Sequence, residues 1–455
     1  MRETVDLLIH GDTVITMNRG REQLTDGAVV VHDGRIVAVT SLADASRRFE
    51  ATATLGGRDT VVIPGLINAH QHLTGDRLLR STIPDDLGLD DALIQWALPS
   101  HAAHTGDLDE LSATLSLVEG VTNGITFTVE AGTVAHPERV LAAFDAVGVG
   151  GTLGSWGWDV GDGPHIGSVA EVLARQIATL ELTAGHPSVD GWVTLVGHDL
   201  MSDDLIVAAG ELALAHDTCL TFHMSPSTAD AEAYLARTGR RPLEHLEHLG
   251  ALGDHLLIAH AVHIDDREVD VVLEHDVAVA SCPWAYLRLG QGITQAFRHR
   301  QLLRQGGRLA LGCDSENAGD SIDILLAARL FAGLVKDSTG DPTSFTAGQA
   351  LALATIEGAR AIGMDHEIGS LEVGKRADVV VVDTTGPIWT PHAADPLIAL
   401  VWASDGRSVR DVVASGRIVV RDRACTGVDL ATFAARAQEV HRDLVSRCGA
   451  HPRDQ

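Results

Sequence analysis

The sequence predicts an α/β protein: a (β/α)8 (TIM) barrel that carries a small β-sandwich domain formed from both chain ends. Between about Val61 and Asp314, eight short apolar runs follow one another, most of them separated by an Ala- and Leu-rich segment of helical length. That alternation is typical of a parallel α/β barrel. The first sixty residues and the stretch after about Ile368 are β-rich and broken by Gly and Asp turns. The chain has 455 residues, and a barrel alone needs about 250.

These textures predict four segments in chain order. Residues 1–62 form the first part of the β-sandwich, 63–367 the barrel, 368–427 the second part of the β-sandwich, and 428–455 a C-terminal helix and tail. A doubly wound open sheet is the rival fold. It would place a Gly-rich phosphate turn after the first strand, where this chain has Asn68-Ala69-His70-Gln71-His72.

Composition excludes several classes of function. The formal net charge is −28 and only two lysines occur, so we expect no nucleic-acid partner. Five cysteines, an odd number without a CxxC pair, indicate a reducing compartment. No apolar run is long enough to span a bilayer, so we expect no membrane partner and a cytoplasmic location.

Five polar residues lie at or just after predicted strands. His70 and His72 alternate along one strand, so their side chains point to the same face. His223, His260 and Asp314 each end a later apolar run. In a barrel these positions gather at one mouth, where imidazoles and a carboxylate can bind a divalent metal.

The order of these residues and their surroundings resemble the amidohydrolase superfamily. The segments that carry the resemblance are PGLINAHQH, RPLEHLEHLGALGDHLLIAHAVHIDD, SCPWAYLRLGQGI and GSLEVGKRADVVVVD. They are similar to the branch that holds cytosine and S-adenosylhomocysteine deaminases and the triazine hydrolases. The resemblance covers nearly the whole chain and implies a small-molecule substrate and a homo-oligomer.

The resemblance also implies a role for each of the five residues. His70, His72 and His223 would bind the metal, and Asp314 would touch it and take a proton from its bound water. His260 would hydrogen-bond that water or lie near the metal. One metal per chain is expected, because the barrel has no lysine between His72 and Val335 that could be carboxylated to bridge two. A bridge through Glu130 stays open. Zn²⁺ suits the ligands, and Fe, Mn or Co suits them too.

One position departs from that branch. Its deaminases carry a Glu three residues after the histidine of the fifth strand, and here that residue is Pro226. Proline cannot donate a proton to a substrate ring. Glu316, two residues after Asp314, is the first candidate for a substitute acid, and His263 is the second.

The predicted substrate contacts are aromatic and polar residues that follow other strands. Trp158 follows the third strand, and Trp284 and Tyr286 follow the seventh, so a flat aromatic or heterocyclic group is expected. Packing of the barrel rim is the alternative for each of these rings. The predicted pocket also contains three polar residues: His198, Glu130 and His263. We expect residues 75–104 to cover this pocket as a lid.

The sequence therefore predicts a metal-dependent hydrolase of a non-peptide C–N bond in a small molecule, acting by attack of a metal-bound hydroxide. Cleavage of an amide, urea or carbamate is slightly favoured, because it demands less of the acid that Pro226 replaces. Deamination of an N-heterocycle with a displaced general acid is the alternative. A catalytically dead barrel that serves as a scaffold is the alternative of another class.

Overall fold

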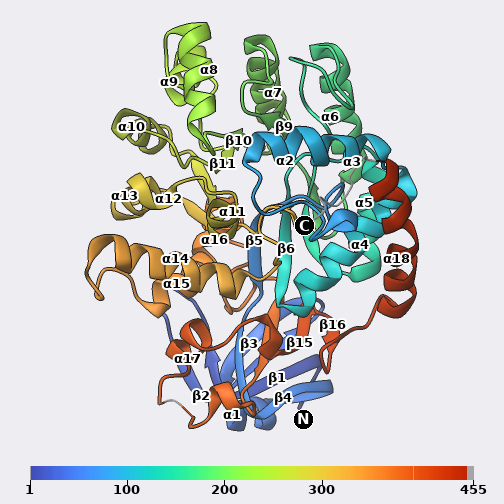
Figure 1. The fold of residues 1–455 in the computed structure, drawn as a ribbon. Coiled ribbons are helices and arrows are strands. Elements are labelled where there is room, and N and C mark those ends of the chain that lie inside the picture. Colours follow the sequence, from blue (N-terminus) through green and yellow to red (C-terminus); the bar gives the residue numbers. More distant parts are fainter. Residues whose placement is uncertain (1, 393, 448–455) are drawn as a thin grey trace.

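A computed structural model describes residues 2–392 and 394–447 of the chain. Figure 1 shows a sheet domain at the bottom of the view and a helix-rich barrel above it. The two parts share a long strand, β4 (Phe49–Pro64), which ends two residues before the first barrel strand begins. This arrangement confirms the predicted combination of a barrel with a sheet domain formed from both chain ends.

The barrel strands form two parallel ladders. Their strands are β5 (Leu66–Gln71), β6 (Ile125–Glu130), β7 (Gly150–Leu153) and β8 (Val189–Gly191) in one ladder, and β9 (Val193–Gly197), β10 (Leu220–Met224), β11 (Leu256–His260), β12 (Ala278–Ser281) and β13 (Leu309–Leu311) in the other. Trp192 alone separates β8 from β9, and its N–H donates to the carbonyl of Leu153 in β7 at 2.9 Å. At the other seam, the N–H groups of Cys313 and Asp314 donate to the carbonyl of His70 at 3.1 and 2.9 Å. The seams close the barrel.

Every residue of β5, β6, β7, β9, β10, β11, β12 and β13 is buried, which is why these strands read as apolar runs. Helices cover their outer side (Figure 1). The barrel helices are α4 (Gly106–Thr122), α5 (Pro137–Val147), α6 (Val169–Thr183), α7 (Asp203–Ala215), α8 (Thr228–Thr238), α9 (Pro242–Leu249), α10 (Asp266–Glu274), α11 (Pro283–Arg288), α12 (Ile293–Ala296), α13 (Arg298–Arg304), α14 (Ile324–Thr339), α15 (Ala347–Leu353) and α16 (Ile356–Ala361).

The sheet domain is one hydrogen-bonded sheet of eight strands with the order β17-β16-β15-β14-β4-β1-β2-β3. Besides β4, its strands are β1 (Glu3–Ile15), β2 (Gln23–His32), β3 (Arg35–Ser41), β14 (Val379–Asp383), β15 (Val409–Ala414), β16 (Arg417–Arg421) and β17 (Ala424–Cys425), with α1 (Leu42–Arg48) after β3. One apolar cluster contains Ile9 and Val31 from the first part of the chain and Val381 and Val413 from the second. The two ends of the chain therefore share one core in this domain.

Strand β4 (Phe49–Pro64) crosses the predicted boundary between residues 62 and 63, and the second part of the sheet domain contains a helix that the sequence did not predict. Helix α17 (Pro396–Trp402) lies in the second part of the sheet domain and packs against α14 and α15 of the barrel. Two 3₁₀ turns, Pro387–Trp389 and Gly406–Ser408, flank it. The C-terminal helix is α18 (Leu430–Arg447), as predicted; residues 448–455 of the predicted tail lie outside the described residues.

The predicted lid is a chain of short helical turns. It contains a 3₁₀ turn at Arg77–Leu79, α2 (Leu89–Ala92), a π-helical turn at Leu93–Ala97 and α3 (Leu98–Ala103). Helix α18 supports this segment beside α4 (Figure 1): Leu444 packs on Leu78 and Leu79 of the lid, and Nδ1 of His441 donates to the carbonyl of Leu78 at 2.7 Å. The lid is thereby fixed to the C-terminal end of the chain.

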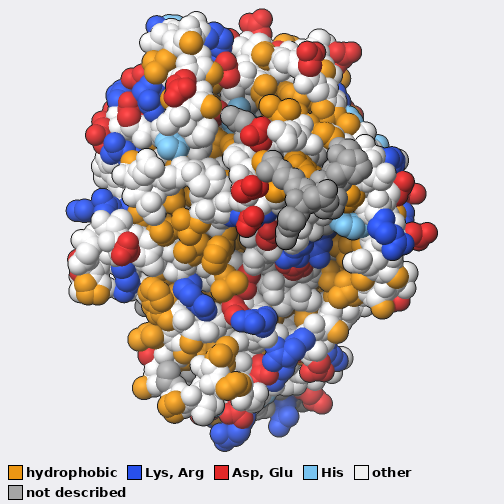
Figure 2. Space-filling view, in the orientation of Figure 1, with side chains coloured by type: hydrophobic (Ala, Val, Ile, Leu, Met, Phe, Trp, Pro, Cys, Tyr) orange, Lys and Arg blue, Asp and Glu red, His pale blue; other side chains and the backbone are white. Residues whose placement is uncertain are grey.

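The surface mixes charges of both signs. On the face drawn in Figure 2, Lys and Arg side chains lie among Asp and Glu rather than in a single basic stripe. Among the described residues, no helix combines the length and apolar character needed to cross a membrane.

Candidate metal centre and active site

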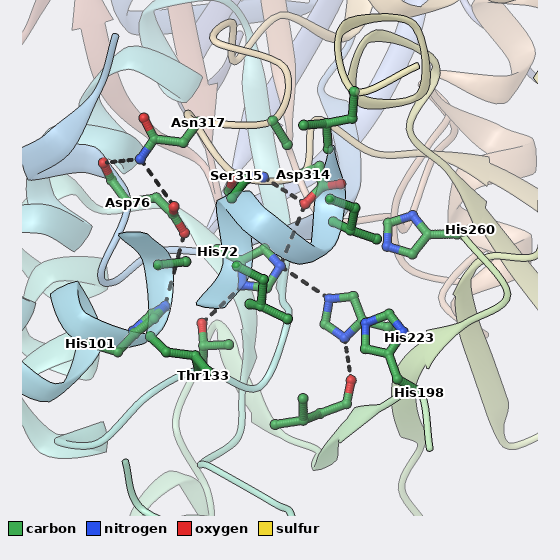
Figure 3. A pocket seen from close by; sticks show the side chains of 18 of the residues that line it. His72, Asp76, His101, Thr133, His198, His223, His260, Asp314, Ser315 and Asn317 are labelled. Carbon is green, nitrogen blue, oxygen red and sulfur yellow. Dashed lines mark hydrogen bonds and ion pairs between the residues drawn. The ribbon is translucent and has the colours of Figure 1, made fainter. Parts of the chain in front are cut away.

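The five strand-end residues meet at one end of the barrel. His70 lies in β5 and His72 follows it, His223 lies in β10, His260 ends β11, and Asp314 follows β13. His72, His223, His260 and Asp314 line one cavity (Figure 3), and His70, only 1% exposed, lies outside its lining. The structure therefore brings together the residues that the sequence selected as metal ligands.

The distances fit ligands of a common cation. Nε2 of His72 and Nε2 of His223 are 3.1 Å apart, and Oδ1 of Asp314 lies 3.5 Å from Nε2 of His72 and 3.8 Å from Nε2 of His70. Ring nitrogens of His70, His223 and His260 lie within 4.8 Å of one another. Ligands about 2.1 Å from one tetrahedral Zn²⁺ are separated by about 3.4 Å, so these spacings suit such an ion.

Hydrogen bonds on the far ring nitrogens aim two of these imidazoles. Nδ1 of His223 donates to the carbonyl of Val196 at 2.5 Å, and Nδ1 of His72 lies 3.0 Å from Oγ1 of Thr133. With the proton on Nδ1, the lone pair of Nε2 faces the cavity. Gly197 permits the first contact, because a Cβ there would lie 2.1 Å from the carbonyl oxygen of His223.

Buried nitrogens without partners support a metal at this place. Within the described part of the chain, neither ring nitrogen of His70 nor Nδ1 of His260 has a hydrogen-bond partner. A buried polar atom without a partner costs about 1–3 kcal/mol, which a bound cation on His70 would offset. Burial, followed by neighbouring histidines, holds the pKa of His70 well below its usual value, and burial lowers the pKa of His223 to about 3. The rings are therefore neutral donors, which fits a divalent metal.

The backbone at the strand ends is constrained. His198, His260 and Asp314 adopt positive φ values of 56°, 80° and 64°. Left-handed backbone at non-glycine residues is uncommon and clusters at functional sites. These turns point the three side chains back over the barrel.

His198 is the predicted substrate contact that the structure places most directly. Its Nδ1 lies 3.2 Å from both carboxylate oxygens of Asp230, and its ring stacks on His223 at 5.5 Å between centroids. Asp230 also accepts the N–H of Ser225, the residue before Pro226, at 2.7 Å. Asp230 therefore ties the loop after β9 to the loop after β10.

The wall opposite the metal ligands is apolar. Lid residues Leu89, Leu93 and Leu98 and the indole rings of Trp156 and Trp158 line it. Trp158, a predicted contact, lines the cavity, and its Nε1 donates to the carbonyl of Pro164 at 3.0 Å. The lid expectation is met, because residues between 75 and 104 form much of this wall.

Three predicted aromatic or histidine contacts do not line the cavity. The hydroxyl of Tyr286 accepts the N–H of Cys282 at 2.8 Å and donates to the carbonyl of Ala280 at 3.4 Å, so this fully buried ring belongs to the barrel wall. Nε2 of His263 faces the carbonyl of Gln291 at 2.6 Å. Trp284 lies in the first turn of α11 and is also absent from the lining. The helix that begins at Pro283 turns this segment away.

The predicted acidic residues Glu130 and Glu316 also lie behind the cavity wall. Glu130 accepts the N–H groups of Gly132 and Thr133 at 2.7 and 3.4 Å, and burial raises its pKa to about 8. That carboxyl group therefore shapes the loop that carries Thr133. None of these contacts supports the alternative in which Glu130 bridges two metal ions.

Glu316 is 1% exposed and interacts with three polar groups outside the lining. It accepts a hydrogen bond from Oγ of Ser116, and Nε2 of Gln71 donates to it at 3.4 Å. Nη1 of Arg77 lies 3.7 Å from it, and burial raises its pKa to about 7. The first candidate for the substitute acid is thus buried beneath the loop that follows Asp314.

The polar lining contains residues that sequence reasoning missed: Asp76, His101, Thr133, Ser315 and Asn317. None of them ends a predicted strand, so the rule that found the metal ligands could not find these. A weak signal existed for Asp76, an acid within the lid start Thr74-Gly75-Asp76 only four residues after His72. His101 lies in lid helix α3, and Thr133, Ser315 and Asn317 lie on loops that follow barrel strands.

The comparisons with known proteins agree with this geometry. The amidohydrolase family matches residues 61–419, and the chain belongs to it. It is accordingly a hydrolase that acts on carbon–nitrogen bonds other than peptide bonds, and the predicted family and enzyme class are confirmed.

Relatives and solved structures of similar length are deaminases and related hydrolases. The chain is 32% identical over 439 residues to a 5-methylthioadenosine/S-adenosylhomocysteine deaminase of Syntrophobacter fumaroxidans, covering 96% of this chain and 98% of the relative. A crystal structure of an adenosine deaminase from Xanthomonas campestris with bound zinc superposes with a TM-score of 0.92, at 29% identity, over 98% of this chain and all of the other. An atrazine chlorohydrolase of Arthrobacter aurescens with zinc shares the fold, with a TM-score of 0.85, 24% identity, and coverage of 96% and 100%.

Proposed function

We propose that the protein deaminates a small N-heterocycle, replacing an exocyclic amino group by a carbonyl oxygen and releasing ammonia. The observation that carries this proposal is the convergence of three histidines and Asp314 beside an apolar cavity with indole walls. The relatives favour the deaminase alternative over acyl cleavage, which the sequence had slightly preferred: one is named a 5'-deoxyadenosine deaminase (Methanothermobacter thermautotrophicus, 29% identical, 87% and 90% covered).

One divalent metal, Zn²⁺ in our proposal, would be held by His70, His72, His223 and Asp314. When bound, it would acidify a water molecule and polarise the substrate. Asp314 would accept a proton from the attacking water and carry it to the leaving nitrogen. Burial raises the pKa of Asp314 to about 6, and a bound cation would oppose that shift by favouring the carboxylate, which is the form that accepts a proton.

His198 and His260 position the reacting groups. Asp230 holds Nδ1 of His198, whose ring lines the cavity and in our proposal hydrogen-bonds a substrate heteroatom. His260 lines the cavity from β11, and its backbone carbonyl accepts a hydrogen bond from Nε2 of His299 at 2.5 Å. Both rings lie beside His223, so they act on atoms next to the metal.

The lining also favours a neutral substrate with an apolar substituent. Among the described residues, no Arg or Lys lines the cavity. A carboxylate buried without a cationic partner is costly, so an amino-acid tail such as that of S-adenosylhomocysteine would be disfavoured. Flat rings, in contrast, match the faces of Trp156 and Trp158, whose centroids lie 6.0 Å apart.

The test is a panel of amino-heterocycles, aryl ureas, carbamates and anilides given to metal-loaded protein, with ammonia and larger amines assayed separately. Ammonia from a ring substrate, abolished in Asp314→Asn with metal content measured alongside, is the expected result. A larger amine with no ammonia would replace deamination by acyl cleavage. Neither product from any substrate, with stoichiometric metal bound, would contradict both.

A further inference from the structure

We propose that Asp76 is the residue that protonates the substrate ring, the role that Pro226 cannot fill. Asp76 lies on the loop between β5 and the first turn of the lid, four residues after His72. The proposal rests on the deaminase function proposed above. It assigns a second catalytic carboxyl group to the cavity, opposite in role to Asp314.

The position of Asp76 is the first support. Asp76 and Asp314 are the two carboxyl groups among the described lining residues, and Asp76 is 4% exposed. In Figure 3, Ser315 lies between Asp76 and Asp314. A ring held by the metal ligands would therefore meet one carboxyl group at the attacked carbon and could meet the other at a neighbouring nitrogen.

Hydrogen bonds from the side chains of Asn317 and Ser315 orient the carboxyl group of Asp76, which lines the cavity. Nδ2 of Asn317 donates to Oδ1 of Asp76 at 3.1 Å and to its backbone carbonyl at 3.0 Å. Oδ2 lies 4.0 Å from Nε2 of His101. Asp76 occupies the N-cap position of the turn Arg77–Leu79, yet its side chain makes no capping hydrogen bond. The carboxyl group therefore has no structural task at that turn.

The surroundings of Asp76 favour its protonated form. The groups around it are Ser315, Asn317 and His101, with the carboxylates of Asp314 and Asp320 nearby. Burial is the main reason why the pKa of Asp76 is raised to about 7; the hydrogen bonds of Asn317 and Ser315 lower this pKa, and the carboxylates of Asp314 and Asp320 raise it. Burial lowers the pKa of His101 to about 3, so that ring is neutral and supplies no counter-charge.

The other acids lack this combination of position and contacts. Glu316 and Glu130 do not line the cavity, and each is already held by hydrogen bonds from the surrounding protein. His263 is held by the carbonyl of Gln291. Asp230 lies beneath His198 and accepts the N–H of Ser225. Asp76 is thus the acid that faces the space a substrate would occupy.

The proposed reaction balances with two carboxyl groups. The oxygen of water bonds to the ring carbon that bears the amino group, Asp314 takes one proton of the water, and Asp76 gives its proton to the adjacent ring nitrogen. The bond to the amino group breaks as Asp314 returns its proton, which releases ammonia. The added hydroxyl gives its proton to the Asp76 carboxylate as the carbonyl forms. One water is consumed and both carboxyl groups are restored.

The test compares Asp76→Asn with Asp76→Glu and Glu316→Gln on a ring substrate that the wild type deaminates. Asp76→Asn can still accept the hydrogen bond of Asn317, so we expect normal folding and metal content, a kcat lower by about 10²–10⁴-fold and little change in KM. The fall of kcat at high pH, which in the wild type reports deprotonation of Asp76, should be absent from the pH profile of Asp76→Asn. Asp76→Glu should recover part of kcat, and Glu316→Gln should keep the wild-type profile.

A second readout does not need a substrate. Infrared difference spectra of wild type against Asp76→Asn, both metal-loaded and near pH 6, should show the carbonyl stretch of one protonated carboxyl group. Wild-type kcat in Asp76→Asn, or no such band, would overturn the role of Asp76 while deamination stands. If the wild type releases no ammonia from any ring, the proposed function fails, and the role of Asp76 fails with it.

Discussion

The floor and the lid of the cavity are built on different principles. The floor is made of strand ends, where the barrel backbone positions the half-buried His72 and the buried His223, His260 and Asp314. The lid is made of short helical turns that present Leu89, Leu93 and Leu98. The proposed metal ligands therefore lie on strand ends, whereas Asp76 and the apolar contacts lie on the lid, whose placement depends on packing; we expect the lid to determine substrate choice.

The largest effect should come from removing a floor residue. We expect His223→Ala to lower metal affinity by more than about 100-fold, because even changes to groups behind the ligands cost about 10–100-fold. Deamination should fall with the metal. Metal content after dialysis and ammonia release at saturating Zn²⁺ measure the two losses. His248→Ala, on the outer helix α9, is the control. If His223→Ala still bound one metal ion per chain, the assignment of metal binding to the floor residues would be wrong.

Support of the floor should have the next largest effect. Thr133→Val removes the hydroxyl 3.0 Å from Nδ1 of His72 and should weaken metal binding by about 10–100-fold. Competition with a chelator gives the affinity. Thr179→Val removes a buried hydroxyl that donates to the carbonyl of Arg175 in α6, and it should leave metal binding unchanged. Equal losses in both variants would show that Thr133 acts through general stability.

A lid change should alter substrate choice and leave the metal in place. The wild type should deaminate 5'-deoxyadenosine faster than S-adenosylhomocysteine, if adenosine derivatives are substrates, because the lining offers a carboxylate no cation. Leu93→Arg adds a cation to the lining. The ratio of kcat/KM for S-adenosylhomocysteine to kcat/KM for 5'-deoxyadenosine should then rise by about tenfold, or about 1.4 kcal/mol. Ile94→Arg, at an adjacent position that is 64% exposed, should not change this ratio. An unchanged ratio in Leu93→Arg would contradict the assignment of specificity to the lid.

The smallest effect on catalysis should come from the support of the lid. Leu444 in α18 is fully buried against Leu78 and Leu79, so Leu444→Ala should lower the free energy of unfolding by about 2–5 kcal/mol. Metal binding should be unaffected and KM should rise modestly. Leu430→Ala, on an exposed part of the same helix, is the control for chemical denaturation. Loss of the metal in Leu444→Ala would mean that floor and lid are not separate.

The sequence predicted the floor well because strand ends obey a simple rule. Alternation aims His70 and His72 to one side, and parallel strands bring His223, His260 and Asp314 to the same mouth. The closure of the barrel follows from the same runs of buried residues. These features depend on the local sequence pattern and on the order of elements along the chain, and the amino-acid sequence contains both.

The lid and the rim could not be predicted in the same way. Tyr286 fails as a contact because α11 begins at Pro283 and directs the hydroxyl to the backbone of β12 and Cys282. Glu316 fails because the turn after Asp314 carries it beneath the cavity, toward Ser116. Asp76 was missed because a lid residue has no periodic signal. In each case the direction of a side chain is set by tertiary packing outside regular strands.

The central claim is that this cavity exchanges a ring amino group for the oxygen of water. The most direct measurement is mass spectrometry of the product formed from a ring substrate in H₂¹⁸O, with ammonia quantified in the same sample. We expect one ¹⁸O atom in the ring product and one ammonia for each molecule converted, with neither formed by Asp314→Asn. A product in which the ring amino group is kept and a larger amine is released would contradict the claim.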